Sequence, residues 1–192
     1  MKKAEYTDKN IIIDILTKSF KTNQSVNYIV QQDRKKIERI RALMDYSFEI
    51  CYNNGEVFLS DDTKACALIL YPDQKKASLK SIFLDVKLIS KCIGLTNIRK
   101  AMRRESLIKS LQPKDKMYYL WFIGVKPEFQ GSGIGTTLLK EVIEHSNQIK
   151  RPVYLETSTL INLPWYKKLG FEIYSELDLG YKLFFLKRTS NY

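Results

Sequence analysis

The sequence predicts a mixed α/β (α+β) fold in which helices flank a mostly antiparallel sheet. Segments with helical periodicity and segments with strand periodicity follow one another along the whole chain. All five prolines lie where one segment ends or the next begins: Pro72, Pro113, Pro127, Pro152 and Pro164. The chain has 192 residues, of which 44% are hydrophobic. That length and composition predict a single domain over residues 1–192 with a sizeable buried core.

The first part of the chain predicts two helices and a hairpin. Asp8 caps the first helix, and the second helix follows Asp33. Each helix carries apolar residues at helical spacing: Ile12, Ile15, Leu16 and Phe20 in the first, and Ile37, Ile40, Met44, Phe48 and Cys51 in the second. Strands over 56–60 and 64–71, joined by a turn at 61–63, then predict a hairpin.

The second part predicts helices and strands in alternation. Two helices over 79–93 and 97–111 are separated near Gly94. The run 117–125 is apolar on both faces, as in a central strand. The remaining elements follow in order: a helix through Ile134, Leu138, Val142 and Ile143, a strand over 153–157, a short helix over 164–169, and a hairpin of 171–177 and 181–186.

Cysteine and histidine usage argues against a metal site and a disulfide framework. The chain has three widely separated cysteines, Cys51, Cys66 and Cys92, and a single histidine, His145. Tetrahedral zinc needs about four ligands at short spacings, so no metal site is predicted. Scattered cysteines in odd number predict reduced, buried thiols. The longest apolar run has nine residues, well below the roughly 18 that span a bilayer, so we expect a cytoplasmic protein with no membrane partner.

A glycine-rich turn follows the central strand. Gln130, Gly131, Gly133 and Gly135 lie within six residues, between Pro127 and an amphipathic helix. Glycine lets backbone N–H groups approach a ligand closely, and a helix N-terminus offers unpaired donors, so this turn predicts an anion site that suits a pyrophosphate. No lysine follows the last glycine, which excludes a P-loop, and the dinucleotide fingerprint would need a glycine at position 136.

The same residues carry a family resemblance. Residues 130–135 match Q/R-x-x-G-x-G/A, the acyl-CoA-binding signature of the GNAT N-acetyltransferase superfamily. Further along, residues 154–158 and the run from Asn162 through Tyr166 to Gly170-Phe171 resemble the fifth strand of that family and the helix after it. The resemblance covers residues 117–174 closely. It implies a central mixed, mostly antiparallel sheet that splays between its fourth and fifth strands.

The resemblance also implies a site for acetyl-CoA. The pantetheine arm would lie between the splayed strands, bonded to the backbones of Ile123 and Val125, with Gly124 easing a bulge. The N–H groups over 131–136 would hold the pyrophosphate, and Asn162 would offer its side-chain amide. The cofactor-binding residues expected are therefore Ile123, Gly124, Val125, Gln130, Gly131, Ser132, Gly133, Ile134, Gly135, Thr136, Asn162 and Tyr166.

The expected reaction is direct attack of an amine on the acetyl thioester. Tyr166 matches the family position of a general acid for the departing thiolate, and its alternative role is an aromatic residue that packs the core. Glu156 is the candidate base through a water, although a structural contact or no dedicated base at all fits the sequence equally well. His145 falls among Glu141, Glu144 and Asn147, which predicts a solvated surface position.

The acceptor expected is an amine of a small molecule or peptide, and the sequence leaves the oligomeric state open between a monomer and a homodimer. The alternative is a non-catalytic acyl-CoA-binding or regulatory module of the same fold.

Charge bears on the partners as well. The net charge is +11, and residues 75–116 hold twelve basic and three acidic residues, a net of +9. This segment forms a solvated helix face, attracts CoA, or selects an acidic acceptor. Phe83 is its one aromatic residue, so a nucleic-acid partner ranks low.

Overall fold

The computed structural model describes residues 1–75 and 78–189. The strands are β1 (Lys2–Lys3), β2 (Gly55–Leu59), β3 (Ala65–Leu70), β4 (Tyr118–Val125), β5 (Val153–Thr157), β6 (Glu172–Asp178) and β7 (Lys182–Arg188). The helices are α1 (Lys9–Phe20), α2 (Gln24–Ile29), α3 (Lys36–Asn54), α4 (Leu79–Leu88), α5 (Ile98–Leu111), α6 (Ile134–Gln148) and α7 (Leu163–Lys168).

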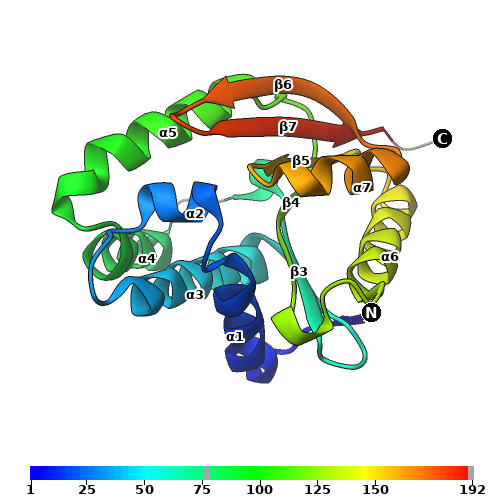
Figure 1. Cartoon of the computed structure of the whole chain (residues 1–192), viewed down its shortest axis with the longest axis horizontal. Coiled ribbons are helices and arrows are strands. Elements are labelled where there is room, and N and C mark those ends of the chain that lie inside the picture. Colours follow the sequence, from blue (N-terminus) through cyan, green and yellow to red (C-terminus); the bar gives the residue numbers. More distant parts are fainter. Residues whose placement is uncertain (76–77, 190–192) are drawn as a thin grey trace.

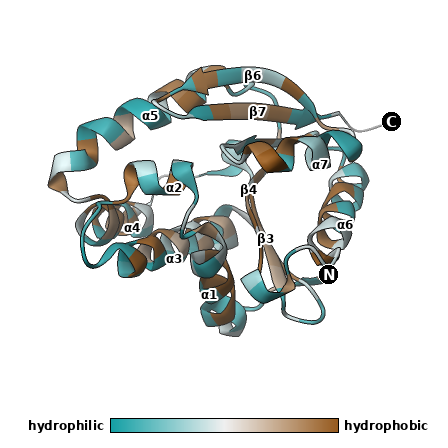
Figure 2. Cartoon of the chain, viewed as in Figure 1, coloured by the Kyte–Doolittle hydropathy of each residue, from teal (hydrophilic) through white to brown (hydrophobic). Residues whose placement is uncertain are grey.

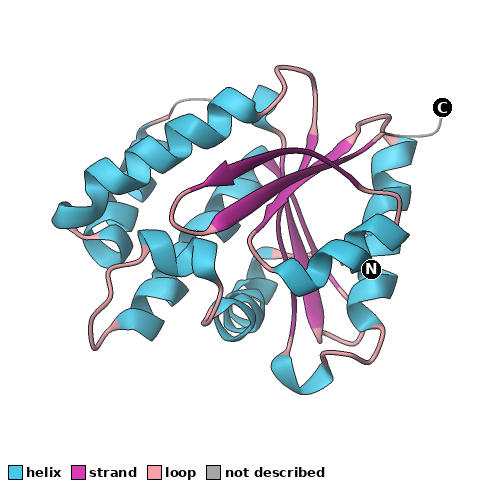
Figure 3. Ribbon diagram, turned by 45° about the horizontal axis from the view of Figure 1, so that its top comes forward, coloured by secondary structure: helices cyan, strands magenta, loops and turns pink. Residues whose placement is uncertain are grey.

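The strands form one sheet with the order β1-β2-β3-β4-β5-β7-β6 (Figure 1). Every pair of neighbours in it is antiparallel except β4 and β5, which run parallel. Helices α1 to α5 lie on one side of the central strands, and α6 and α7 lie on the other (Figures 1 and 3). The predicted mixed, mostly antiparallel sheet flanked by helices is therefore confirmed.

Each face of the sheet has its own core, because the side chains of a strand alternate between the two faces. In β3, Leu68 and Leu70 pack with α1 and α3, whereas Ala67 and Ile69 pack with α6. Hydrophobic residues accordingly run along most of β3 and β4 (Figure 2). This double burial explains why residues 117–125 are apolar on both faces.

The sheet opens between β4 and β5. These strands are paired only at Tyr118 with Val153 and at Tyr119 with Tyr154. The register between β3 and β4 shifts by one residue at the same level, which makes Trp121 the extra residue of a β-bulge. The bulge expected at Gly124 is therefore misplaced by three residues. A Cβ on Gly124 would lie 3.0 Å from Leu16 Cδ2, so this glycine instead permits the close approach of α1.

The helices differ from the predictions at three points. Helix α2 was not expected, although Asn23 caps it by accepting a hydrogen bond from the Val26 N–H at 3.0 Å. Ile37, expected on the buried face of α3, is 54% exposed. A π-helical turn over Ile89–Ile93 continues α4 up to Gly94, where the predicted break occurs.

His145, expected at a solvated surface position, is half-buried, with 26% of its side-chain surface exposed. Its ring packs edge-on against Phe58 at 5.1 Å between centroids, and its Nδ1 lies 3.2 Å from the Tyr118 hydroxyl. The prediction was wrong because it considered only neighbours on α6, whereas both of these partners come from the sheet beneath it.

Other sequence expectations concern burial. The three cysteines are free and buried, as predicted, and burial raises the pKa of each thiol. Among the described residues, no helix is both long and apolar enough to cross a bilayer. Lys76, part of the basic segment, lies outside the described residues.

A buried ion cluster ties α1 to α3. Lys9 Nζ lies 2.7 Å from Asp45 and 2.6 Å from Glu49, and the Tyr6 hydroxyl also donates to Glu49. Burial alone would raise the pKa of Glu49. The hydrogen bonds from Lys9, Tyr6 and Lys80 outweigh burial and lower this pKa to about 2.

We therefore expect Glu49→Gln to destabilise the fold at neutral pH but not in acid. The pKa of Glu49 is lower in the folded than in the unfolded chain, so its stabilisation is present above about pH 5 and is lost as pH falls toward 2. Urea unfolding at pH 7, 5 and 3 measures this difference. If wild type and variant differ by the same free energy of unfolding at all three pH values, the lowered pKa assigned to Glu49 is contradicted.

Candidate active site

A cavity of about 1700 Å³ occupies the opening between β4 and β5. Residues of both strands line it, from Tyr119 to Val125 and from Leu155 to Thr157. On one face of the sheet its wall is formed by the glycine turn and α7, and on the other by residues of α2, α4 and α5. The cavity thus joins the two faces through the parted strands.

The backbone edge of β4 faces this opening. The Lys126 N–H donates to Lys64 O at 2.8 Å, which sets the alternation of the antiparallel ladder with β3. That alternation turns the backbone groups of Ile123 and Val125 away from β3, toward the side where β5 has already parted. The Val125 carbonyl accepts hydrogen bonds from Ser19 Oγ at 2.7 Å and Gln130 Nε2 at 3.2 Å. The N–H groups of both residues remain directed into the cavity.

The glycine turn presents a row of donors. Within the described residues, none of the backbone N–H groups from Gly131 to Thr136 donates a hydrogen bond. Gly131 and Gly133 have φ of +81° and +89°, a region that favours glycine. A Cβ on Gly135 would lie 3.2 Å from Val125 Cγ2, so a side chain there would crowd the end of β4. Unpaired N–H groups at the start of α6 form an anion cradle.

The polar side chains of this segment shape the turn. Gln130 bonds to the Val125 carbonyl, Ser132 Oγ donates to Phe129 O at 2.6 Å, and Thr136 Oγ1 accepts from Trp165 Nε1 at 3.0 Å. Ile134 packs against the core beneath α6. The hydrogen bond between Trp165 and Thr136 ties the start of α6 to α7, which carries Tyr166.

Tyr166 has a buried ring and a free hydroxyl. The residue is 5% exposed, and its ring packs against Trp165 and Phe171. It lines the cavity, and its hydroxyl makes no hydrogen bond to any described residue. Burial raises the pKa of this phenol, so it stays protonated at neutral pH and is available as a donor.

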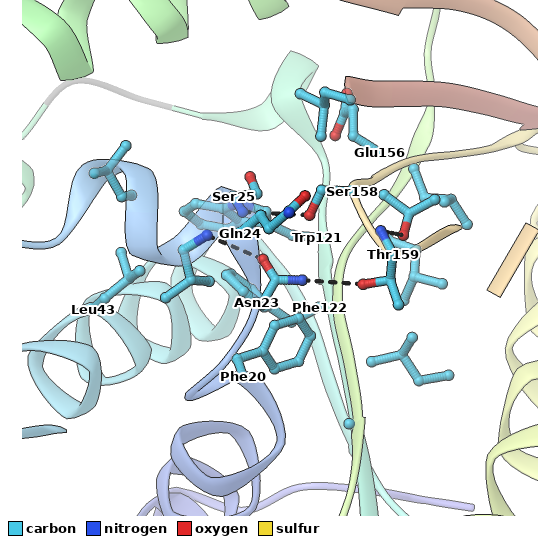
Figure 4. A pocket seen from close by; sticks show the side chains of 18 of the residues that line it. Phe20, Asn23, Gln24, Ser25, Leu43, Trp121, Phe122, Glu156, Ser158 and Thr159 are labelled. Carbon is cyan, nitrogen blue, oxygen red and sulfur yellow. Dashed lines mark hydrogen bonds between the residues drawn. The ribbon is translucent and has the colours of Figure 1, made fainter. Parts of the chain in front are cut away.

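Glu156 lies where β4 and β5 begin to part, and it also lines the cavity (Figure 4). Its carboxylate accepts hydrogen bonds from the Tyr119 hydroxyl at 2.5 Å and from Gln112 Nε2 at 2.8 Å. Burial raises the pKa of Glu156 despite these two bonds. A carboxylate with a raised pKa in a cavity is suited to accept a proton.

The wall on the α2 side was not foreseen. Asn23 Nδ2 donates to Thr159 Oγ1 at 3.4 Å, and the Ser25 N–H donates to Ser158 Oγ at 3.3 Å (Figure 4). These bonds attach α2 to the segment that follows β5. Asn162, at the end of that segment, lines the cavity as well. The helix cap at Asn23 was the one sequence signal for this wall.

An aromatic and apolar wall covers the same half of the cavity. Trp121, displaced by the bulge, packs edge-on against Tyr46, and the Tyr46 hydroxyl donates to Asp85 at 2.7 Å. Apolar residues of α4, the π-helical turn and α5 complete this wall: Leu88, Ile89, Ile93, Ile98 and Ala101. Among the described residues, no group of three or more His, Cys, Asp or Glu side chains is arranged to hold a metal ion.

The sequence comparisons identify the family. The model of the acetyltransferase (GNAT) family matches residues 56–171, which include β4, the glycine turn, β5 and α7. The chain belongs to this family. The resemblance noted in the glycine turn and around Tyr166 is thereby confirmed.

Individual relatives are more distant. An uncharacterized N-acetyltransferase from Schizosaccharomyces pombe is 37% identical over 57 residues, which are 30% of this chain and 23% of that protein. The chain therefore matches about a quarter of the length of this curated relative.

Two solved structures share the fold over the whole chain. A structure of histone acetyltransferase HPA2 and related acetyltransferase from Corynebacterium glutamicum aligns with a TM-score of 0.75 and 20% identity, covering 100% of this chain and 96% of that one. An arylalkylamine N-acetyltransferase 2 from Aedes aegypti aligns with a TM-score of 0.64 and 16% identity, covering 99% and 98%.

Proposed function

We propose that this GNAT protein transfers an acetyl group from acetyl-CoA to an amine of a small molecule or peptide. The observation that carries the proposal is the row of unpaired N–H groups from Gly131 to Thr136, beside a strand edge that faces an open gap. Acetyl-CoA supplies an activated acetyl thioester. The N–H row fits its pyrophosphate, and the backbones of Ile123 and Val125 fit the amides of its pantetheine arm.

The proposed transfer would use groups that line this cavity. Glu156 accepts the proton of the attacking amine through a water, since burial raises its pKa and so makes it a better proton acceptor. Tyr166 donates a proton to the departing thiolate from a hydroxyl that has no partner among the described residues. The Ile123 N–H faces the gap and stabilises the negative charge that develops on the acetyl oxygen. Asn162 lines the cavity where the cofactor arm would pass.

Replacing Gly133 with aspartate tests the pyrophosphate cradle. The new carboxylate repels a phosphate and occupies the cradle, so the Kd for acetyl-CoA should rise at least about tenfold, equivalent to about 1.4 kcal/mol. Calorimetric titration with acetyl-CoA measures this effect. Gly180→Asp is the matched control, because Gly180 has a φ of +83°, open space around it and no place in the turn. Equal affinity of the Gly133 variant and wild type would refute the cradle.

Tyr166→Phe tests the general acid. Loss of a positioned proton donor should lower kcat by about 100-fold or more while the Kd for acetyl-CoA stays the same. Release of free thiol from acetyl-CoA in the presence of an amine panel gives the rate. Tyr154→Phe, a half-buried tyrosine outside the cavity lining, should leave the rate unchanged. If the wild type binds acetyl-CoA but releases no thiol with any amine, the protein is a binding module instead of an enzyme.

Glu156→Gln tests the base through the pH dependence. A protonated Glu156 accepts no proton, so kcat/KM of the wild type falls as pH drops through its raised pKa. Protonation of the amine substrate also lowers kcat/KM as pH drops. We expect the variant to have a lower kcat/KM and a shallower acid limb, because it keeps only the contribution of the substrate. Identical acid limbs would assign Glu156 a structural role.

A further inference from the structure

Arg104 of α5 lines the half of the cavity opposite the glycine turn, and it has no acidic partner among the described residues. The residue is half-buried. Its Nη2 donates to Ser25 Oγ at 2.6 Å and its Nε to the Tyr181 hydroxyl at 3.2 Å. Both partners are neutral, and the second terminal nitrogen, Nη1, donates to no described residue. The described hydrogen-bond partners of Arg104 are therefore hydroxyl groups, which do not neutralise a half-buried guanidinium.

Other basic residues of the cavity wall differ from Arg104. Lys75 is exposed, and Lys109 is exposed and lies 3.5 Å from Glu105 on the same helix. Arg104 is held in place instead. Ser25 belongs to α2, and the Tyr181 ring packs on Tyr28 at 5.2 Å between centroids. The hydroxyl groups therefore orient the guanidinium in the cavity without neutralising it.

Arg104 also lies close to the proposed reaction centre. Ser25, which it contacts, is hydrogen-bonded to Ser158, two residues after Glu156 (Figure 4). The charge of Arg104 acts on Glu156 directly, since it works to lower the pKa of that carboxyl against the effect of burial. The proposed proton acceptor and a fixed positive charge thus line the same cavity.

We propose that the acceptor is a small amino carboxylate with an apolar body, and that Arg104 binds its carboxylate while its amine lies at Glu156. This inference rests on the proposed acetyl transfer to an amine. The planar guanidinium matches a carboxylate with two parallel hydrogen bonds. The apolar body would lie against the wall formed by Trp121, Tyr46 and the residues of α4 and α5.

Other classes of acceptor match the positive charge of Arg104 less well. An amine without an anionic group would bring a second positive charge beside Arg104, and a peptide N-terminus would offer it only a neutral carbonyl. A phosphate group carries nearly two negative charges, whereas a carboxylate carries the single charge that matches one guanidinium. A zwitterion carries one charge of each sign, so its carboxylate can pair with Arg104 while its amino group lies at Glu156.

Matched compounds with a common body test the proposal. L-phenylalanine, L-phenylalaninamide and 2-phenylethylamine differ only at the carboxyl position, as do L-leucine, its amide and 3-methylbutylamine. In the wild type, kcat/KM measured by thiol release should be about 30-fold or more higher for at least one amino acid than for its amide and amine. Arg104→Gln should remove that preference by lowering kcat/KM for the amino acid far more than kcat/KM for the amine. A wild type that prefers either carboxylate-free compound in both series overturns the proposal.

Control variants separate recognition from a structural role. Arg103→Gln removes the same charge from the exposed side of α5 and should leave every ratio unchanged. Tyr181→Phe removes a hydrogen bond of Arg104 but keeps the guanidinium, so the preference for the amino acid should survive. If Tyr181→Phe abolishes the preference as completely as Arg104→Gln does, the arginine is only a structural contact. An unchanged thermal shift with acetyl-CoA shows that each variant is folded.

A binding measurement keeps this test independent of catalysis. Calorimetric titration of the CoA-loaded protein with L-phenylalanine and L-leucine requires no acetyl transfer. Binding that is weakened about 30-fold or more by Arg104→Gln supports the proposal even if no thiol release is seen. In that case only the proposed reaction fails. Binding that is indifferent to Arg104, or absent for both amino acids, overturns the proposal even if amines are acetylated.

Discussion

The parting of β4 and β5 after two paired residues is the constraint on which the rest of the site depends. The N–H and C=O groups of an unpaired strand edge inside a protein need other hydrogen-bond partners. In this gap a ligand or water would supply them. The bulge at Trp121 is the local cause, because an extra residue increases the twist of β4 and bends it away from its neighbour. Without that opening the two faces of the sheet would be sealed from each other.

The opening gives each face a separate task. The face covered by α6 and α7 carries the glycine turn and Tyr166, which belong to the proposed cofactor side. The face covered by α2, α4 and α5 carries Arg104 and the wall around Trp121, which belong to the acceptor side. Glu156 lies between them, where the strands separate. In the proposed reaction, proton transfer would take place where the acetyl donor and the acceptor meet, and burial raises the pKa of both Glu156 and Tyr166 there.

Local motifs account for the half of the site that was predictable. The conformation of the glycine turn depends on backbone freedom at Gly131 and Gly133, and the strand before it depends on a run of apolar residues. Both features can therefore be recognised from a segment of about twenty residues. The residues of the proposed acceptor side could not be predicted from such a short segment of sequence. Arg104 is one of twelve basic residues in its segment, and nothing in the sequence separates it from its exposed neighbour Arg103. The same limit explains His145, whose ring partners lie on other elements.

The sequence by itself determined the periodicity of the helices and strands, the glycine turn at the start of a helix, and the family to which the chain belongs. Those properties follow from steric limits on neighbouring residues and from side-chain spacing along one element. Only the tertiary structure decided where the bulge falls, that α2 lines the cavity, and that the described hydrogen-bond partners of Arg104 there are hydroxyl groups. These depend on contacts between residues far apart in the chain, such as Ser25 with Ser158 and Arg104 with Tyr181, and burial and charge balance are set by such contacts.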